Sequence, residues 1–269
     1  MDPRALAYVA AKTRGGHEAG LPVTLHFHPD RSTVDGRPLL AAMAEDGFYR
    51  SQFETGTSNG GLTAYPGGDR WQWESRMFGG AYDDAAPAER PKYGALNFRR
   101  RAVGGAPRFG SAHFRMAAHT VERTTFCYPD SVLDPSDFGH GTRVSALIAL
   151  ADQDDTDLLD DYIEAHVHGP IDLKTDVEAV VLDPSHRDTD VERAARRLGC
   201  PVEWHPGFRL STEELRRHPA YRGPEFVELG LALAEDGYLD PRVLGDADHR
   251  DPQALKRVWH YVARFGVLP

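Results

Sequence analysis

Two short stretches of the sequence, "VTLHFHPDR" and "YIEAHVHG", carry paired histidines in a pattern typical of β-strands. Apolar and polar residues alternate in both, so successive side chains would point to opposite faces of a sheet. His26 and His28 would share one face of the first strand. Glu164, His166 and His168 would share one face of the second. The sequence therefore predicts two strands whose polar faces carry imidazole and carboxylate groups.

One chemistry open to these residues is metal binding. Imidazoles two residues apart on a strand can converge on one ion, and Glu164 or Asp30 could complete the coordination of Zn²⁺ or Mn²⁺. The imidazole ligands would be His26, His28, His166 and His168. The His-x-His opening resembles metal-dependent hydrolases of the amidohydrolase and PHP kinds, although the eight strand-helix units of a barrel are not evident here. A metal-dependent hydrolase is one alternative for the function.

A second chemistry centres on Glu164 and a glycosidic bond. A carboxylate that accepts a hydrogen bond from a sugar hydroxyl can stabilise the positive charge that develops on the neighbouring ring carbon. Taken alone, Glu164 is more simply explained as an exposed carboxylate on a strand. Its neighbours in the sequence decide between the two interpretations.

Two other motifs give weaker indications of function. "DFGHGT", from Asp137, contains fragments of kinase and subtilase signatures without the other elements of either family, and we expect it to be a turn. "TGTSNGGLTAYPGG" is too rich in glycine for regular structure, and loops of this length are often functional. It lacks the Gly-Lys-Ser/Thr ending of a P-loop.

Composition narrows the class of protein. The chain has 269 residues, 41% of them hydrophobic, and a formal net charge of −10. Such a charge does not favour nucleic acid as a partner, although a local basic groove could still bind it. No stretch has the length of a membrane span, and the first residues lack the apolar core of a signal peptide. We expect a cytoplasmic protein whose two cysteines, Cys127 and Cys200, stay reduced.

The hydrophobic periodicity predicts alternating helices and strands, with a helical C-terminal region. Helices are expected in "RPLLAAMAEDG", "RWQWESRMFGG", "VSALIALA" and "DVERAARRLG", and in most of the chain after residue 211. Further strands are expected in "FYRSQFE", "PKYGALNFR", "SAHFRMA", "RTTFCYPDS", "VEAVVLD" and "CPVEWHP". This order predicts an α+β fold.

The order of motifs resembles the ADP-ribosyltransferase superfamily. In "YIEAHVHGPIDLKTDVEAVVLD", Glu164 is followed by apolar residues, a Gly-Pro turn and a second hydrophobic strand, as the catalytic glutamate is in many members. The combination of "HFHPDR", "SQFETGTSNGG" and "ERPKYGALN" also looks like an uncharacterised bacterial domain family of that fold. The end of the region is similar to toxins that ADP-ribosylate DNA. The resemblance covers residues 21–206.

The resemblance implies a role for each matching residue. Glu164 would be the catalytic glutamate, and either His26 or His28 would hold the adenosine ribose of NAD. Tyr93 would stack on the nicotinamide ring. The NAD phosphates or their ribose would lie near a loop made of Thr57, Ser58, Asn59 and Gly60.

The sequence departs from the superfamily pattern at two points. Members that modify arginine carry Gln or Glu two residues before the catalytic glutamate, where this chain has Tyr162, so arginine is not expected to be the acceptor. The Ser-Thr-Ser strand of the superfamily is missing unless Thr57 and Ser58 are its remnant.

The resemblance implies a split β-sandwich of two small, mostly antiparallel sheets around an NAD cleft, followed by a helical appendix. We expect residues 1–206 to form the catalytic domain and residues 207–269 the appendix. The expected reaction transfers ADP-ribose from NAD, as a substrate, to an acceptor that could be protein, nucleic acid, a small molecule or water. The alternatives are the metal-dependent hydrolase and a non-catalytic module that binds NAD or another nucleotide.

Overall fold

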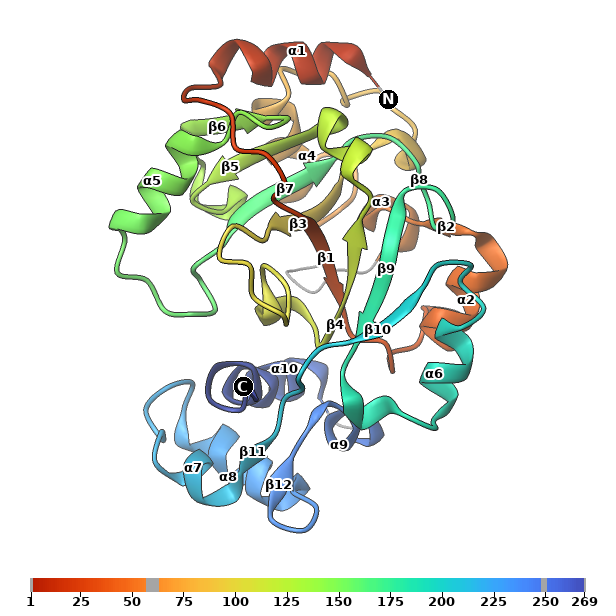
Figure 1. The fold of residues 1–269 in the computed structure, drawn as a ribbon, viewed down its shortest axis with the longest axis vertical. Coiled ribbons are helices and arrows are strands. Elements are labelled where there is room, and N and C mark those ends of the chain that lie inside the picture. The colour runs from red at the N-terminus through yellow and green to blue at the C-terminus, as the bar shows by residue number, and fades with distance from the viewer. Residues whose placement is uncertain (1, 57–62, 248–250, 269) are drawn as a thin grey trace.

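The computed structural model describes residues 2–56, 63–247 and 251–268 and is built on one mixed sheet of eight strands (Figure 1). The strand order is β10-β9-β4-β1-β3-β7-β5-β6, and every pair of neighbours is antiparallel except the parallel pair β9 and β10. The strands are β1 (Val23–Phe27), β3 (Lys92–Leu96), β4 (Ala112–Met116), β5 (Thr124–Tyr128), β6 (Asp137–His140), β7 (Ile163–Val167), β9 (Val177–Leu182) and β10 (Val202–Trp204). The expected α+β class is confirmed.

The sheet consists of two halves that meet at a short joint between β1 and β3. These two strands pair at only two positions, Val23 with Leu96 and Thr24 with Ala95, whereas β3 pairs with β7 along its full length. In Figure 1, β1, β4 and β9 run at a steep angle to β3, β5 and β7. The expectation of two separate sheets is therefore corrected to one sheet, because β1 pairs with β3 along one edge and with β4 along the other.

One face of the sheet is apolar, as the alternating pattern predicts. Leu25 and Phe27 of β1 point into the same hydrophobic core as Ile163, Ala165 and Val167 of β7. Three helices contribute to this core, namely α2 (Leu39–Asp46), α5 (Ser145–Gln153) and α6 (Asp190–Ala195). Pro38 precedes α2 and Gly47 ends it in a left-handed conformation, with φ 74°, as expected for this pair of residues.

The opposite face of the sheet is polar but is covered as well. Over the half that contains β3, β5 and β7 lie α1 (Pro3–Lys12) and α4 (Asp69–Met77), which together with the turn after α4 form a second hydrophobic cluster. In this cluster Phe78 packs against His166 of β7, and Tyr82 packs against His168 just after the strand. The polar strand face is therefore an interior surface rather than an open cleft wall.

The C-terminal region is largely helical, as predicted, and has a hydrophobic cluster of its own. Its helices are α7 (Thr212–Arg216), α8 (Pro224–Leu233), α9 (Pro241–Asp246) and α10 (Pro252–Phe265). Two short strands, β11 (Leu210–Ser211) before α7 and β12 (Tyr238–Leu239) before α9, pair with each other. These elements form the lower part of the molecule in Figure 1. Val103 and Leu159, from before residue 207, belong to the same cluster. The domain boundary at residue 206 stays a prediction.

Two local expectations are wrong. The stretch expected as the strand "FYRSQFE" pairs with β8 (Ile171–Asp172) only as β2 (Phe48–Tyr49) and then becomes the helix α3 (Gln52–Thr55). Ser51 and Glu54 form a reciprocal capping box there, which favours helix. The expected turn at Asp137 is instead the edge strand β6, which is held by its ladder with β5.

Within the described residues, no helix is both long and apolar enough to cross a membrane.

Candidate functional site

The polar face of β7 brings a carboxylate and an imidazole into direct contact. Oε1 of Glu164 lies 2.9 Å from Nε2 of His166, two residues further along the strand. The other carboxylate oxygen accepts a hydrogen bond from the backbone N–H of Ser131, at 3.4 Å. The side chain of Glu164 is 8% exposed and that of His166 is 1% exposed. The pair is thus held in the interior with each of its polar groups engaged.

A single hydroxyl orients His166 of β7 and His168, which directly follows the strand. Oγ1 of Thr125, on the neighbouring strand β5, lies 3.1 Å from Nδ1 of His166 and 2.8 Å from Nε2 of His168. The hydroxyl of Tyr82 lies 2.6 Å from the other ring nitrogen of His168. Burial keeps the pKa of His168 well below its ordinary value. His168 therefore acts as a neutral bridge between Tyr82 and Thr125.

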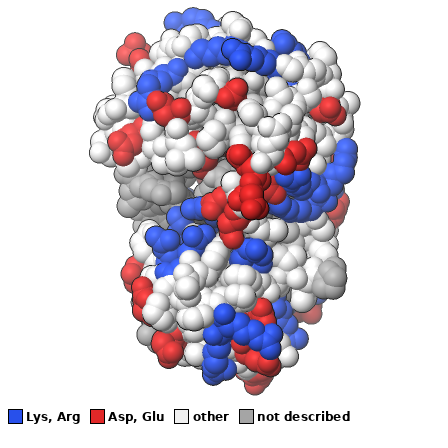
Figure 2. Space-filling model, turned by 90° about the vertical axis from the view of Figure 1, so that its left-hand side faces the viewer, with Lys and Arg blue, Asp and Glu red and all other residues white. Residues whose placement is uncertain are grey.

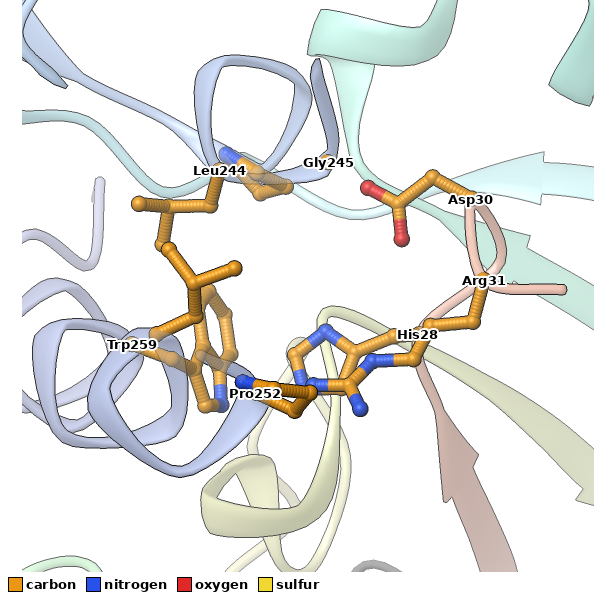
Figure 3. A pocket seen from close by; sticks show the side chains of 9 residues that line it. His28, Asp30, Arg31, Leu244, Gly245, Pro252 and Trp259 are labelled. Atoms are coloured by element: carbon orange, nitrogen blue, oxygen red, sulfur yellow. The ribbon is translucent and has the colours of Figure 1, made fainter. Parts of the chain in front are cut away.

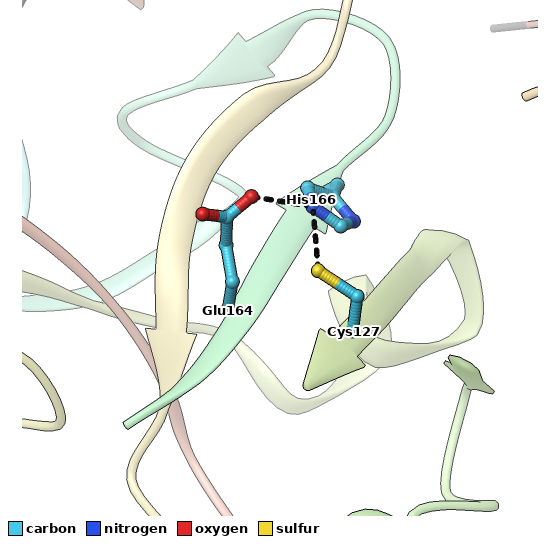
Figure 4. A group of neighbouring side chains, drawn as sticks. All are labelled: Cys127, Glu164 and His166. Atoms are coloured by element: carbon cyan, nitrogen blue, oxygen red, sulfur yellow. Dashed lines mark hydrogen bonds and ion pairs between the residues drawn. The ribbon is translucent and has the colours of Figure 1, made fainter. Parts of the chain in front are cut away.

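Cys127 completes a compact group with Glu164 and His166 (Figure 4). It stands opposite Glu164 in the ladder of β5 and β7, and its Sγ lies 3.8 Å from Nε2 of His166. One ligand atom from each of the three residues lies within 4.8 Å of the others. Among the residues that the structure describes, this is the one group whose spacing suits a metal ion.

The charge state of Glu164 follows from two opposing effects. Burial raises the pKa of its carboxyl group, but the hydrogen bond with His166, the charge of that imidazole and the Arg70 guanidinium lower it. The lowering effects prevail, so the pKa of Glu164 lies below its ordinary value. The carboxylate is negative at neutral pH, as a group that stabilises a developing cation must be.

Tyr93 lies on β3 beside His166, with its ring covered. The two rings meet edge to face, 5.3 Å apart, because Tyr93 and His166 are ladder partners. The guanidinium of Arg70 lies over the Tyr93 ring at 4.1 Å, and the Tyr93 hydroxyl donates a 3.0 Å hydrogen bond to Glu74. The space in which a nicotinamide ring would stack is occupied by Arg70.

Glu74 joins this group to the rest of the covering helix. Its carboxylate is fully buried and forms a 2.6 Å ion pair with Arg90. Burial raises the pKa of Glu74 to about 7, in spite of the neighbouring Arg90 and Tyr93. Arg70 and Glu74 are four residues apart on α4 and so point to the same side of the helix.

His26 points from the same face of the sheet as Glu164. The ladder aligns Thr24 with Ala95 and Ala95 with Glu164, and His26 is two residues from Thr24. Both ring nitrogens of His26 are already engaged, since Nδ1 lies 3.1 Å from the carbonyl of Gly110 and Nε2 accepts the N–H of Ala106 at 3.2 Å. Burial lowers the pKa of His26 to about 4.

His28 lies in a different environment because β1 ends at Phe27. Its ring meets Trp259 of α10 edge to face, 5.2 Å away, and lines a small pocket of about 30 Å³ between β1 and the C-terminal helices (Figure 3). Asp30 and Arg31 line the same pocket. The alternative in which the two His-x-His pairs form one metal site gains no support, because His26 and His28 have separate partners and neither belongs to the Cys127 group.

The remaining expected ligands, Thr57, Ser58, Asn59 and Gly60, lie outside the described residues. Four residues of the site were missed by the sequence interpretation, namely Arg70, Glu74, Thr125 and Cys127. The four-residue spacing of Arg70 and Glu74 and the placing of Thr125 and Cys127 two residues apart could be seen in the sequence. What the sequence lacked was any sign of which strand and which helix would face Glu164.

A family model described as "protein of unknown function (DUF3626)" matches residues 22–151 and 140–265. The chain belongs to this family. The first segment carries His26, Tyr93 and Cys127, and the second carries Glu164. The second segment of the DUF3626 match also runs across the expected domain boundary at residue 206. No curated protein matches the chain.

The surface charge of this DUF3626 protein is mixed on the face that Figure 2 shows. Lys and Arg side chains and Asp and Glu side chains gather side by side around the hollow between the upper and lower parts of the molecule. This face does not carry the uniformly basic surface that favours binding of nucleic acid.

Proposed function

We propose that this protein transfers ADP-ribose from NAD to an acceptor, with release of nicotinamide and with Glu164 as the catalytic carboxylate. One observation carries the proposal. His26, Tyr93 and Glu164 come from three consecutive strands of the sheet, β1, β3 and β7, and from the same face. These are the three residue types that the superfamily resemblance requires around NAD, and they are far apart in the sequence.

The chemistry would use the negative charge of Glu164. As the bond between nicotinamide and the ribose carbon breaks, nicotinamide leaves with the bonding electron pair and the ribose becomes positive. A carboxylate that accepts a hydrogen bond from the adjacent ribose hydroxyl stabilises this cation. The nucleophile of the acceptor then forms the new bond and loses its proton. His166, at 2.9 Å, would keep Glu164 ionised and fixed in position.

NAD binding would require the site to open. Arg70 must leave the face of Tyr93 before a ring can stack there, and the turn that holds His26 must release its ring nitrogens. Enzymes often close such groups over a substrate and so exclude water from the reaction. Arg70 would then be free to approach the negatively charged phosphates of NAD.

The acceptor is open in this proposal and includes protein, nucleic acid, a small molecule and water. The hydroxyl of Tyr162, which directly precedes β7, donates a hydrogen bond to Asp130. A tyrosine held in this way supplies no amide or carboxylate of the kind that arginine-modifying relatives place there. The metal-dependent hydrolase has less support, because the histidines of the two His-x-His pairs do not converge on one point.

The test is incubation of the purified protein with NAD, followed by mass spectrometry of the products. Free nicotinamide, with ADP-ribose or an ADP-ribosyl adduct, is expected. Glu164→Gln should keep the fold but reduce cleavage by roughly 10²-fold or more, because the amide has no charge to offer the transition state. Glu178→Gln, on the 56% exposed side chain of β9, is the matched control and should cleave NAD at the wild-type rate.

Three outcomes would count against the proposal. If Glu164→Gln cleaves NAD within a few-fold of the wild type, Glu164 is not the catalytic carboxylate. If NAD binds and is never cleaved under any condition, the protein is a non-catalytic binding module. If the protein neither binds nor cleaves NAD but hydrolyses other substrates only when loaded with metal, the hydrolase alternative is correct.

A further inference from the structure

We propose that Cys127, Glu164 and His166 form a binding site for Zn²⁺ or a similarly soft divalent cation. Their side chains converge from β5 and β7 on one point (Figure 4). Two metal bonds of about 2.0–2.3 Å at a tetrahedral angle place ligand atoms roughly 3.3–3.6 Å apart. The observed separations are 3.8 Å between Cys127 Sγ and His166 Nε2, and 2.9 Å between His166 Nε2 and Glu164 Oε1. The ligand atoms of Cys127 and Glu164 lie within 4.8 Å of each other, so small movements of the side chains would complete the geometry.

The groups behind the ligands already hold them in the orientation that a metal needs. Thr125 contacts Nδ1 of His166, so the other nitrogen, Nε2, faces Cys127 and Glu164. The backbone N–H of Ser131 holds Oε2 of Glu164 and leaves Oε1 directed at the imidazole. Metal-binding histidines usually have such a partner on their second nitrogen, because it fixes the ring and its tautomer.

The charges of the site balance when a divalent cation is present. A thiolate and a carboxylate carry two negative charges, which Zn²⁺ neutralises, while His166 binds as neutral imidazole. Without metal the thiol stays protonated, because burial and the negative charges of Glu164 and Asp130 raise the pKa of Cys127. Metal binding would release the thiol proton and any proton on Nε2 to the solvent.

The donor set selects the kind of metal. A sulfur, an imidazole nitrogen and a carboxylate oxygen suit Zn²⁺ or Co²⁺, whereas Mg²⁺ and Ca²⁺ prefer oxygen ligands alone. With three protein ligands, the fourth position would be left to water. Such a site would also hold Oε1 of Glu164, so metal and NAD cleavage would exclude each other. Only this last consequence rests on the proposed function.

The primary experiment measures metal without NAD. The wild type and the variants Cys127→Ser and Cys200→Ser are expressed in zinc-supplemented medium, so that the buried site can fill as the chain folds, and bound metal is quantified by mass spectrometry. Cys200 is the other cysteine of the chain and is half-buried, so Cys200→Ser is the matched control. The wild type and the control should carry one zinc per chain, and Cys127→Ser should bind zinc at least roughly 100-fold more weakly.

Cobalt identifies the ligands. Co²⁺ in the wild type and in Cys200→Ser should show a thiolate charge-transfer band, which Cys127→Ser should lack. A wild type free of zinc, equal zinc in Cys127→Ser, or a band that disappears with Cys200 instead would each overturn the site. Circular dichroism shows whether Cys127→Ser is folded, and His166→Gln provides a second variant that should also lose the metal.

The consequence for catalysis is measured separately. Zinc should inhibit NAD cleavage by the wild type and by Cys200→Ser, each relative to its own zinc-free rate, and inhibition of Cys127→Ser should need at least roughly 100-fold more zinc. A protein that binds zinc but never cleaves NAD would contradict only the proposed function. A protein that cleaves NAD but binds no zinc would contradict only the metal site.

Discussion

His166 Nε2 and Glu164 Oε1 lie 2.9 Å apart on the same face of the same strand. Side chains alternate between the two faces of a strand, so residues two apart lie on the same face. Thr125 fixes the orientation of the His166 ring, and this brings the polar atoms of His166 and Glu164 into contact. The imidazole thereby offsets the burial that would otherwise raise the pKa of the carboxyl group. This relationship makes Glu164 the most specific candidate for chemistry in the described part of the chain.

Replacement of His166 by glutamine should shift the pH dependence of NAD cleavage. The reaction needs ionised Glu164, whose pKa His166 keeps below its ordinary value, so activity is lost only as the pH falls through that low pKa. Without His166 the effect of burial prevails and the pKa rises, so the acidic limb of the rate profile should move to higher pH. An unshifted limb, with a uniformly lower rate, would leave His166 a purely structural role.

Replacement of Thr125 by valine should destabilise the protein. Thr125 is fully buried, and its hydroxyl serves one nitrogen of His166 and one of His168. Valine has nearly the same shape but leaves those nitrogens without that partner, which costs about 1–3 kcal/mol for each buried polar group. Urea denaturation should show this loss, while Thr125→Ser, which keeps the hydroxyl, should show much less of it. Equal losses in both variants would mean that packing of the methyl group matters instead.

The ion pair of Glu74 and Arg90 should give stability a distinctive pH dependence. Burial raises the pKa of Glu74 from 4.5 to about 7, so between these values the folded state holds a proton that the unfolded state has lost. Folding stability due to this group is therefore greatest at low pH and falls as the pH rises towards about 7. Relative to Glu74→Gln, the wild type should lose roughly 2 kcal/mol between about pH 5 and about pH 8.

The variant Glu74→Gln will itself be less stable, because it leaves Arg90 without a charged partner in the interior. The measurement is therefore the change with pH in the difference between the two unfolding free energies. Other titrating groups are common to both proteins and cancel in this difference. A difference that stays constant, or that changes in favour of the wild type as the pH rises, would contradict the raised pKa.

Replacement of Gly245 by alanine should weaken the contact between the C-terminal helices and the segment after β1. Gly245 lies in α9, where alanine would normally stabilise the helix by up to about 1 kcal/mol. Here a Cβ atom would overlap the carboxylate of Asp30, which lies beside Gly245 at the pocket (Figure 3). The melting temperature should fall. In Gly16→Ala the new Cβ would lie 3.6 Å from the Ser145 hydroxyl oxygen, an ordinary contact, so this control should melt near the wild-type temperature.

Much of the site's local geometry could be predicted from the sequence. The alternation in "YIEAHVHG" places Glu164, His166 and His168 on one face, because the strand period depends only on the backbone between near neighbours. The same local rule placed Leu25 and Phe27 in the core. Proline and glycine marked the ends of α2 for an equally local reason, since each restricts or permits particular backbone angles.

What covers the polar face was decided by the tertiary structure alone. Cys127 and Tyr93 come from strands that flank β7, and Arg70 comes from a helix packed across them, with no nearby sequence signal linking any of these residues to Glu164. The same packing separated His26 from His28, because β1 ends between them and each ring then meets a different segment. Periodicity describes which side of its own strand a residue occupies. Which distant segment packs against that side depends on the packing of the whole chain, because the hydrophobic effect that brings segments together is non-directional.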